Sequence, residues 1–198
     1  MKKNNSYLLD LIKSQKDNFS LDQSFYTNKS IFEMDLKTFF FNQWVFVGHI
    51  SRIKNKGDYF LFSIGEESII IIRENEDKIN AFYNVCRHRG SHICLEEEGR
   101  VRKFVCPYHA WNYELSGKLL KARMMDDNFK PKNWSLKKCN CIVFEGLIFI
   151  NLSDNASDFQ NFINPIEDFI KLHGLGKAKI AARKIYPTKG NWLSLIHI

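Results

Sequence analysis

Apolar and polar residues alternate, or form short apolar runs, through the middle of the chain, a pattern typical of β-strands. Turn-forming residues separate these runs, and Gly146 marks a bend or a hairpin in the last of them. The pattern predicts an antiparallel meander with strands at 59–64 (YFLFSI), 68–73 (SIIIIR), 78–85 (KINAFYNV), 104–105 with 112–115, and 141–152 (CIVFEGLIFINL).

Helical signals lie on both sides of this β region. Residues 1 to about 30 are polar with weak helical signals, and 35–48 (DLKTFFFNQWVFVG) predicts a short helix that runs into a strand near 44–47. Apolar residues recur at helical spacing over 157–173, with Pro165 expected near a helix start or at a kink and Gly174 and Gly176 as stop signals. Residues 177–187 predict one more strand. The expected organisation is a helical N-terminal segment (1–43), a β domain (44–152), a linker helix with the first strand of another domain (153–192), and a tail (193–198).

Composition and charge exclude several classes of protein. With 44% hydrophobic and 26% charged residues, the 198-residue chain has the composition of a globular protein and not of a disordered one. The net charge is +7, but the basic residues are scattered among 22 acidic ones instead of gathering in one stretch. We therefore expect no nucleic-acid binding.

The sequence also predicts a cytoplasmic protein without a membrane segment. The longest uncharged run, 38–51, has 14 residues and is too short and too polar to span a bilayer. Asp10 interrupts the first apolar stretch, so no signal peptide is expected. The chain has five cysteines, an odd number, and in this setting clustered Cys and His residues indicate metal or redox chemistry before disulfides.

Two short segments each pair one cysteine with one histidine. Cys86 and His88 are two residues apart, and Cys106 and His109 are three apart. Four ligands of this kind suit either zinc or a [2Fe–2S] cluster. A structural zinc finger usually takes both cysteines from one arm and both histidines from the other, whereas mixed arms can supply two metal ions at once.

At these residues the chain resembles the large (alpha) subunits of Rieske non-haem iron oxygenases, also called ring-hydroxylating oxygenases. The resemblance covers roughly 30–192 and is carried by CRHRG at 86–90, CPYHAWNYELSGKL at 106–119 and EGLIFINL at 145–152. It implies a mainly-β, antiparallel Rieske β-sandwich with flanking N-terminal helices, followed by the start of an α+β catalytic domain. It also implies a [2Fe–2S] cluster held by Cys86, His88, Cys106 and His109.

The family resemblance further implies an oxygenase that hydroxylates or N-demethylates a small organic substrate with O2 and electrons from a reductase or ferredoxin. CRHRG, the Ala-Trp pair after His109, and MMDDNF at 124–129 look most like the quaternary-amine enzymes, which act on glycine betaine, choline, carnitine or stachydrine. An aromatic-ring dioxygenase is the alternative within the family.

In that family a mononuclear Fe(II) site lies in the catalytic domain, of which this sequence holds only a beginning. KGNW at 189–192 resembles the start of the segment that leads to the iron ligands. The tail LSLIHI (193–198) matches the translated end of a sequencing transposon, so we expect the natural sequence to differ after Trp192, and His197 is not taken as an iron ligand. The family implies a homotrimer in which His109 of one subunit passes an electron through an acidic bridge to the neighbour's iron.

Two alternatives from other classes remain, a free-standing Rieske ferredoxin and a structural zinc module. We expect no metal role for His92, Cys94, Cys139 or Cys141, which are interpreted as loop or core residues. Trp111 and Tyr108 are expected to shield the cluster from water. The acidic run 96–98 is expected to be solvated.

Overall fold

The computed structural model describes residues 2–123, 125–126 and 128–197, without the side chains of 2–5 and 196–197. The packing divides into two units. The larger one spans Phe39–Arg183, and the smaller one joins the residues up to Thr38 to those from Lys184 onwards. The sequence-based domain boundaries stay predictions.

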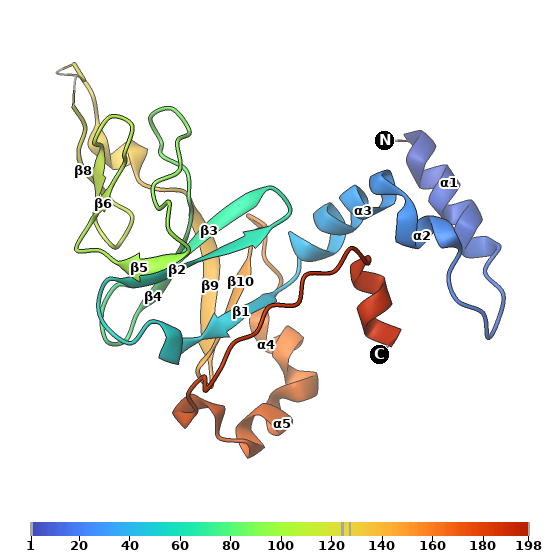
Figure 1. The fold of residues 1–198 in the computed structure, drawn as a ribbon. Coiled ribbons are helices and arrows are strands. Elements are labelled where there is room, and N and C mark those ends of the chain that lie inside the picture. The colour runs from blue at the N-terminus through green and yellow to red at the C-terminus, as the bar shows by residue number, and fades with distance from the viewer. Residues whose placement is uncertain (1, 124, 127, 198) are drawn as a thin grey trace. The chain divides into compact units, whose positions relative to one another are not determined.

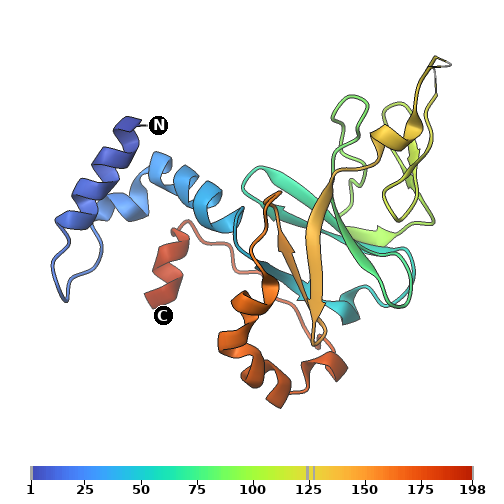
Figure 2. The same ribbon diagram turned by 180° about the vertical axis from the view of Figure 1, so that it is seen from behind.

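The larger unit is built on a seven-stranded antiparallel sheet (Figures 1 and 2). β9 connects its two halves, because residues 138–139 pair with β4 while 140–144 pair with β10. The mainly-β, antiparallel class expected from the sequence is confirmed. The strands, in order across the sheet, are β1 (Val45–His49), β10 (Leu147–Asn151), β9 (Lys138–Phe144), β4 (Ile79–Tyr83), β3 (Glu67–Arg73), β2 (Asp58–Ile64) and β5 (Glu98–Arg100).

β3 explains the apolar run SIIIIR. Its side chains alternate between the two faces of the sheet, so Ile69 and Ile71 pack in one core while Ile70 and Ile72 pack in another. All four are fully buried. A strand with a core on each face is apolar at every position, which is why this stretch shows no polar alternation.

A second, three-stranded antiparallel sheet consists of β6 (Phe104–Val105), β7 (Asn112–Tyr113) and β8 (Leu119–Lys121). Its inward side chains Phe104, Tyr113 and Leu119 share a core with Ile70 and Ile72 of β3. This core supports the two loops that carry the candidate ligands.

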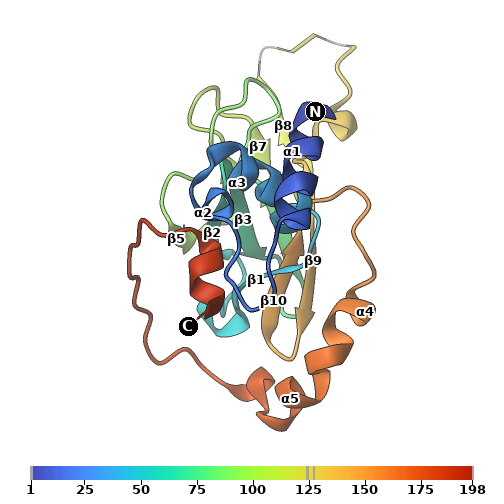
Figure 3. The same cartoon turned by 90° about the vertical axis from the view of Figure 1, so that its right-hand side faces the viewer.

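The helical region expected over 157–173 forms two short helices, with a break at Pro165. α4 (Phe159–Ile163) and α5 (Glu167–Leu172) are joined by a 3₁₀ turn, Asn164–Ile166. Pro165 lies in that turn, and its ring has no N–H to continue an α-helix. Phe159, Ile163 and Ile170 pack against Phe149 of β10, so both helices cover the end of the unit opposite the three-stranded sheet (Figures 1 and 3).

The strand expected at 177–187 is not formed. Residues 178–187 have no strand partner among the described residues, and their side chains are exposed. An extended segment becomes a strand only when a neighbouring strand pairs with its backbone. Near its start the segment is attached to the body of the unit by a hydrogen bond from the Ile180 N–H to the Ser51 hydroxyl (3.2 Å).

The smaller unit contains α1 (Lys2–Lys13), α2 (Gln23–Thr27) and α3 (Lys29–Asp35). The side chain of Asn28 caps α3 by accepting hydrogen bonds from the Ser30 and Ile31 N–H groups. The sequence pattern predicted a helix that starts at Asp35. In the structure α3 already begins at Lys29, and a π-helical turn, Leu36–Phe40, follows it.

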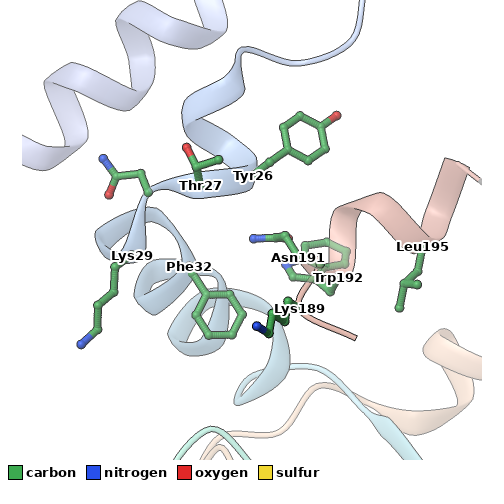
Figure 4. Close-up of a pocket in the computed structure, with 10 residues that line it drawn as sticks. Tyr26, Thr27, Lys29, Phe32, Lys189, Asn191, Trp192 and Leu195 are labelled. Carbon is green, nitrogen blue, oxygen red and sulfur yellow. The ribbon is translucent and has the colours of Figure 1, made fainter. Parts of the chain in front are cut away.

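A hollow of about 490 Å³ lies between this helical region and residues 189–195 of the same unit (Figure 4). It is lined by Lys29, Phe32, Lys189, Asn191 and other residues that include no Cys, His or carboxylate. The hollow therefore lacks the thiolate, imidazole and carboxylate groups that usually bind a transition metal. Across the described residues, no helix combines the length and the apolar character needed to cross a bilayer.

Candidate metal centre

Two loops with the same backbone hydrogen-bond pattern carry the four candidate ligands. One loop follows β4, and the other joins β6 to β7. In each loop the cysteine N–H donates to the carbonyl five residues later, and the N–H four residues later donates back to the cysteine carbonyl. The four bonds are Cys86 N to Ser91 O (2.8 Å), Gly90 N to Cys86 O (3.0 Å), Cys106 N to Trp111 O (2.8 Å) and Ala110 N to Cys106 O (2.9 Å).

The fourth residue after each cysteine has a left-handed backbone. Gly90 has φ +74° and Ala110 has φ +56°. Glycine adopts this conformation without strain, whereas an L-residue such as Ala110 loses about 1–2 kcal/mol in it. The two loops are thus equivalent in backbone shape, although one uses glycine at this position and the other does not.

Asn84 fixes the base of the first loop. Its side chain is fully buried, accepts hydrogen bonds from the N–H groups of Ile93 (3.0 Å) and Cys94 (2.9 Å), and donates to the Cys94 carbonyl (2.8 Å). These bonds join the two ends of the loop and satisfy buried backbone groups that would otherwise be unpaired.

The two histidines face each other through the same ring atom. His88 Nδ1 and His109 Nδ1 are 3.1 Å apart. Two metal–nitrogen bonds of about 2.0–2.1 Å at a tetrahedral angle would place the nitrogens about 3.3 Å apart, so the observed spacing suits two ligands of one metal ion. Desolvation, the neighbouring His109 and the charge of Arg89 lower the pKa of His88, and a neutral imidazole is the form that binds metals.

The two cysteines are buried beside each other. The pKa of the Cys86 thiol is raised overall, mainly because the thiol is buried. Hydrogen bonds from Tyr113 and the His88 backbone lower this pKa, whereas the neighbouring Cys106 raises it. A metal ion would offset this cost, because it binds the thiolate and supplies positive charge.

The donor set forms two pairs and not one group. Across residues 2–123, 125–126 and 128–197, no three Cys, His, Asp or Glu side chains converge as ligands of a single ion would. A zinc site closed by four protein ligands requires such convergence, whereas in a two-iron Rieske cluster each iron takes two protein ligands. The residues present therefore fit a [2Fe–2S] cluster.

Tyr113 contacts the cysteine pair. Its hydroxyl is 3.3 Å from Cys86 Sγ and accepts a hydrogen bond from the Arg87 N–H (3.2 Å). Burial is the main cause that raises the pKa of Tyr113. The phenol thus stays protonated, and its hydrogen is available to a thiolate sulfur.

Aromatic rings enclose the histidine pair unevenly. Trp111 is buried and stacks on His88 with ring centroids 4.9 Å apart, while Phe129 and Trp134 pack against its far side. The ring centroids of Tyr108 and His109 are 3.8 Å apart, but the Tyr108 side chain is 59% exposed. Trp111 therefore covers one face of His88, and both histidines are half-buried.

No other cysteine or histidine among the described residues joins these four in a group of three or more donors, although Cys94 shares a buried core with Cys86 and Cys106. His92 is exposed, and Cys94, Cys139 and Cys141 are free thiols. Burial raises the pKa of each of these three thiols to about 12, so they remain protonated at neutral pH.

Sequence reasoning did not single out Asn84 or Tyr113. A signal for Tyr113 was present, because it alternates with Trp111 and Leu115, and all three point inward. Asn84 carried no such signal, since its three backbone partners lie nine and ten residues away in a loop.

An antiparallel β unit that presents two thiols and two imidazoles on paired loops has the features of an iron–sulfur domain of the Rieske class. Residues 43–139 match the Rieske [2Fe-2S] domain family, and this part of the chain belongs to that family. The resemblance and the [2Fe–2S] cofactor expected from the sequence are confirmed.

The chain is homologous to oxygenase subunits over nearly its whole length. It is 37% identical over 188 residues to a glycine betaine monooxygenase oxygenase subunit from Pseudomonas aeruginosa, covering 94% of this chain and 44% of the relative. It is 30% identical over 176 residues to a benzene 1,2-dioxygenase subunit alpha from Pseudomonas putida, covering 87% of this chain and 39% of the relative. The chain thus spans less than half the length of these relatives.

Solved structures agree with this grouping. The quaternary ammonium Rieske monooxygenase CntA, in complex with L-carnitine, superposes with a TM-score of 0.80 at 32% identity, covering 87% of this chain and 50% of that one. Naphthalene 1,2-dioxygenase with indole bound superposes with a TM-score of 0.64 at 31% identity, covering 69% of this chain and 32% of that one.

Proposed function

We propose that Cys86 and Cys106 bind one iron of a [2Fe–2S] cluster and that His88 and His109 bind the other. The observation that carries this proposal is the paired-loop arrangement, which brings two Nδ1 atoms to 3.1 Å and buries two thiols side by side. Each loop would supply one sulfur and one nitrogen ligand.

When bound, such a cluster supplies one-electron transfer. The chain's own residues would set the conditions for it. Tyr113 donates a hydrogen bond to the Cys86 sulfur, and Trp111 excludes water from one face of His88. His109 lies beside the exposed ring of Tyr108, and we propose that it is the ligand that faces a redox partner.

We propose that the whole protein is the alpha subunit of a Rieske oxygenase. In this proposal the described domain passes electrons, one at a time, to a mononuclear Fe(II) centre that lies outside the 198-residue sequence. There O2 would be used to hydroxylate or N-demethylate a small organic substrate. The supporting observation is that the homology extends beyond the Rieske domain into both flanks.

We propose a quaternary amine as the substrate class. The identity of 37% with a glycine betaine monooxygenase subunit exceeds the 30% with a benzene dioxygenase subunit, and the overlay on CntA covers more of the chain than the overlay on naphthalene dioxygenase. An aromatic-ring dioxygenase is the second candidate, favoured by the homology to the benzene dioxygenase subunit.

The partners proposed are a reductase or ferredoxin as electron donor and, in the full-length protein, two further copies that complete a trimer.

We also propose that the protein acts in the cytoplasm, because all five cysteines are free thiols and a reducing compartment keeps them so. A free-standing ferredoxin is less well supported, because the shared homology includes about 40 residues on each side of the cluster domain.

The ligand assignment is tested with two cysteine variants. We expect Cys86→Ser to lose the visible absorption of the cluster and the electron paramagnetic resonance signal of its reduced form, because one iron loses a sulfur ligand. Cys94→Ser is the matched control, since Cys94 is equally buried but makes no ligand pair, and it should keep both signals. A Cys86→Ser protein with the full spectrum, or stoichiometric zinc in place of iron and sulfide, would overturn the assignment.

The oxygenase proposal needs the full-length protein with a reductase. Oxygen uptake with glycine betaine, choline or carnitine, accompanied by formaldehyde, would support quaternary-amine demethylation. A cis-diol formed from an aromatic ring, with no turnover of amines, would support the second candidate. Electron transfer without oxygen uptake on either class would indicate the ferredoxin.

A further inference from the structure

A hollow of about 280 Å³ in the larger unit is lined by four cationic side chains, those of Lys54, Arg73, Lys177 and Lys179. The remaining lining residues are Ile50, Ser51, Gly176 and Ala178, so no acidic side chain lines it. The hollow joins the turn after β1, the end of β3, and the segment that follows α5.

Arg73 gives this hollow a buried positive charge that pairs with no carboxylate among the described residues. The side chain is 9% exposed, its Nε donates to the Ile53 carbonyl (2.6 Å), and its Nη1 donates to the Glu76 carbonyl (2.6 Å). Its Nη2 has no hydrogen-bond partner within the part of the chain that the structure describes. Backbone carbonyls orient the guanidinium but leave its net charge uncompensated, which favours an anion at the free edge.

The two lysines of the later segment are held in place by a clamp. His49 is buried, and its Nε2 donates to the Leu175 carbonyl (2.9 Å). The Ser51 hydroxyl donates a hydrogen bond to His49 Nδ1 (2.9 Å) and accepts one from the Ile180 N–H (3.2 Å). Lys177 and Lys179 lie between these two attachment points, so their backbone is positioned before any ligand arrives.

The surrounding charges do not neutralise the hollow. In the described structure, Lys54, Lys177 and Lys179 take part in no ion pair. The Glu145 carboxylate lies 3.4 Å from where a Cβ on Gly176 would be, but Glu145 does not line the hollow. Glu74, next to Arg73 in the chain, pairs with Lys78 and not with Arg73. None of the residues that line the hollow is acidic, so its lining carries an excess of positive charge.

We propose that this hollow binds a phosphate-type oxyanion, either inorganic phosphate or the phosphate of a small phosphomonoester. A dianion with several acceptor oxygens matches cations that converge from three segments, whereas one carboxylate could compensate only part of the charge. A bound phosphate would join the segment after α5 to the body of the Rieske domain. This inference does not depend on the proposed oxygenase activity.

The test is a binding measurement on the 198-residue chain purified with its cluster. Calorimetric titrations with inorganic phosphate and with glycerol phosphate, each against chloride at equal ionic strength, distinguish the two sources. We expect saturable binding of at least one of them and, for the Lys177→Gln/Lys179→Gln variant, affinity weakened about tenfold, because two charge-assisted contacts are removed.

Lys130→Gln/Lys132→Gln is the matched control, with the same charge change and spacing on exposed lysines outside the hollow. It should bind like the unchanged chain. Equal weakening in both double variants, or saturation that neither changes, would mean an adventitious ion only and would overturn the proposal.

A second readout uses trypsin, which cleaves after lysine. Phosphate should slow cleavage after Lys177 and Lys179 in the unchanged chain and should protect less in Lys54→Gln, which keeps both cleavage sites. The visible spectrum of the cluster verifies that each variant is folded. Cleavage that phosphate does not slow would contradict the proposed contact with this segment.

Discussion

Replacing Asn84 with alanine should loosen the first ligand loop and destabilise the domain. The change removes the partner of three backbone groups, the N–H of Ile93 and both the N–H and the carbonyl of Cys94. Each buried backbone group left without a partner costs about 1–2 kcal/mol, so Asn84→Ala should lower the free energy of unfolding by about 3–6 kcal/mol. The loss falls at the base of the loop that holds Cys86 and His88.

Urea titration followed by circular dichroism measures this loss, as a shift of the midpoint at an unchanged slope. Bleaching of the visible absorption at a urea concentration below the midpoint should also be faster, because the opened loop releases its ligands. Asn140→Ala is the control, since Asn140 donates to two carbonyls at an exposed position and should cost about 1 kcal/mol or less. If Asn84→Ala costs no more than this control, the role assigned to Asn84 is refuted.

Three further predictions concern the loops and the pH range of stability. Ala110→Gly should raise the free energy of unfolding by about 0.5–1 kcal/mol in urea titrations, because it removes the strain of φ +56°. Tyr113→Phe should lower the cluster's reduction potential by about 40 mV in a redox titration, which corresponds to about 1 kcal/mol of lost stabilisation of the more negative, reduced state. Burial alone would raise the pKa of Glu74, but hydrogen bonds from Asn80 and Lys78 lower it overall from 4.5. Because the folded pKa lies below the unfolded one, this contribution is complete above about pH 4.5 and is lost as the pH falls through the folded value; Glu74→Gln should flatten the acid side of a Tm–pH profile.

Each of these has a result that would count against it. A free energy of unfolding for Ala110→Gly that is equal to or below that of the unchanged chain would contradict the proposed strain. Tyr83→Phe removes a hydroxyl that donates to the Leu152 carbonyl and contacts neither Cys86 nor Cys106 in the described structure, so it should leave the potential unchanged. An equal shift in both tyrosine variants would remove the special role of Tyr113. An unchanged acid slope in Glu74→Gln would show that its hydrogen bonds form equally in the unfolded chain.

The sequence predicted those parts of the fold that depend on local pattern. β2 and β3 lie within one residue of their expected bounds, because short apolar runs between charged turns have few other ways to fold. Gly146 occurs between β9 and β10 with φ +77°, as the expected hairpin requires. The resemblance to the Rieske family also depended on local motifs, and it is confirmed by the match over 43–139.

What the sequence did not predict depends on distant partners. The expected strand at 177–187 was wrong because strand propensity cannot supply a neighbouring backbone. At 157–173 the helical pattern left open whether Pro165 starts a helix or bends one; in the structure it lies in a turn between two helices. The role of Asn84 depends on groups that only the folded loop brings together. The four ligand positions stay a prediction until a variant tests them.

The shared backbone pattern of the two loops has a mechanical consequence. If each loop holds one sulfur and one nitrogen ligand as proposed, then each iron is anchored to both loops, and neither loop can shift without straining bonds to both metal ions. Such cross-bracing resists the small changes in bond length that accompany gain or loss of an electron. A centre braced in this way can exchange electrons quickly, because little of its surroundings has to rearrange.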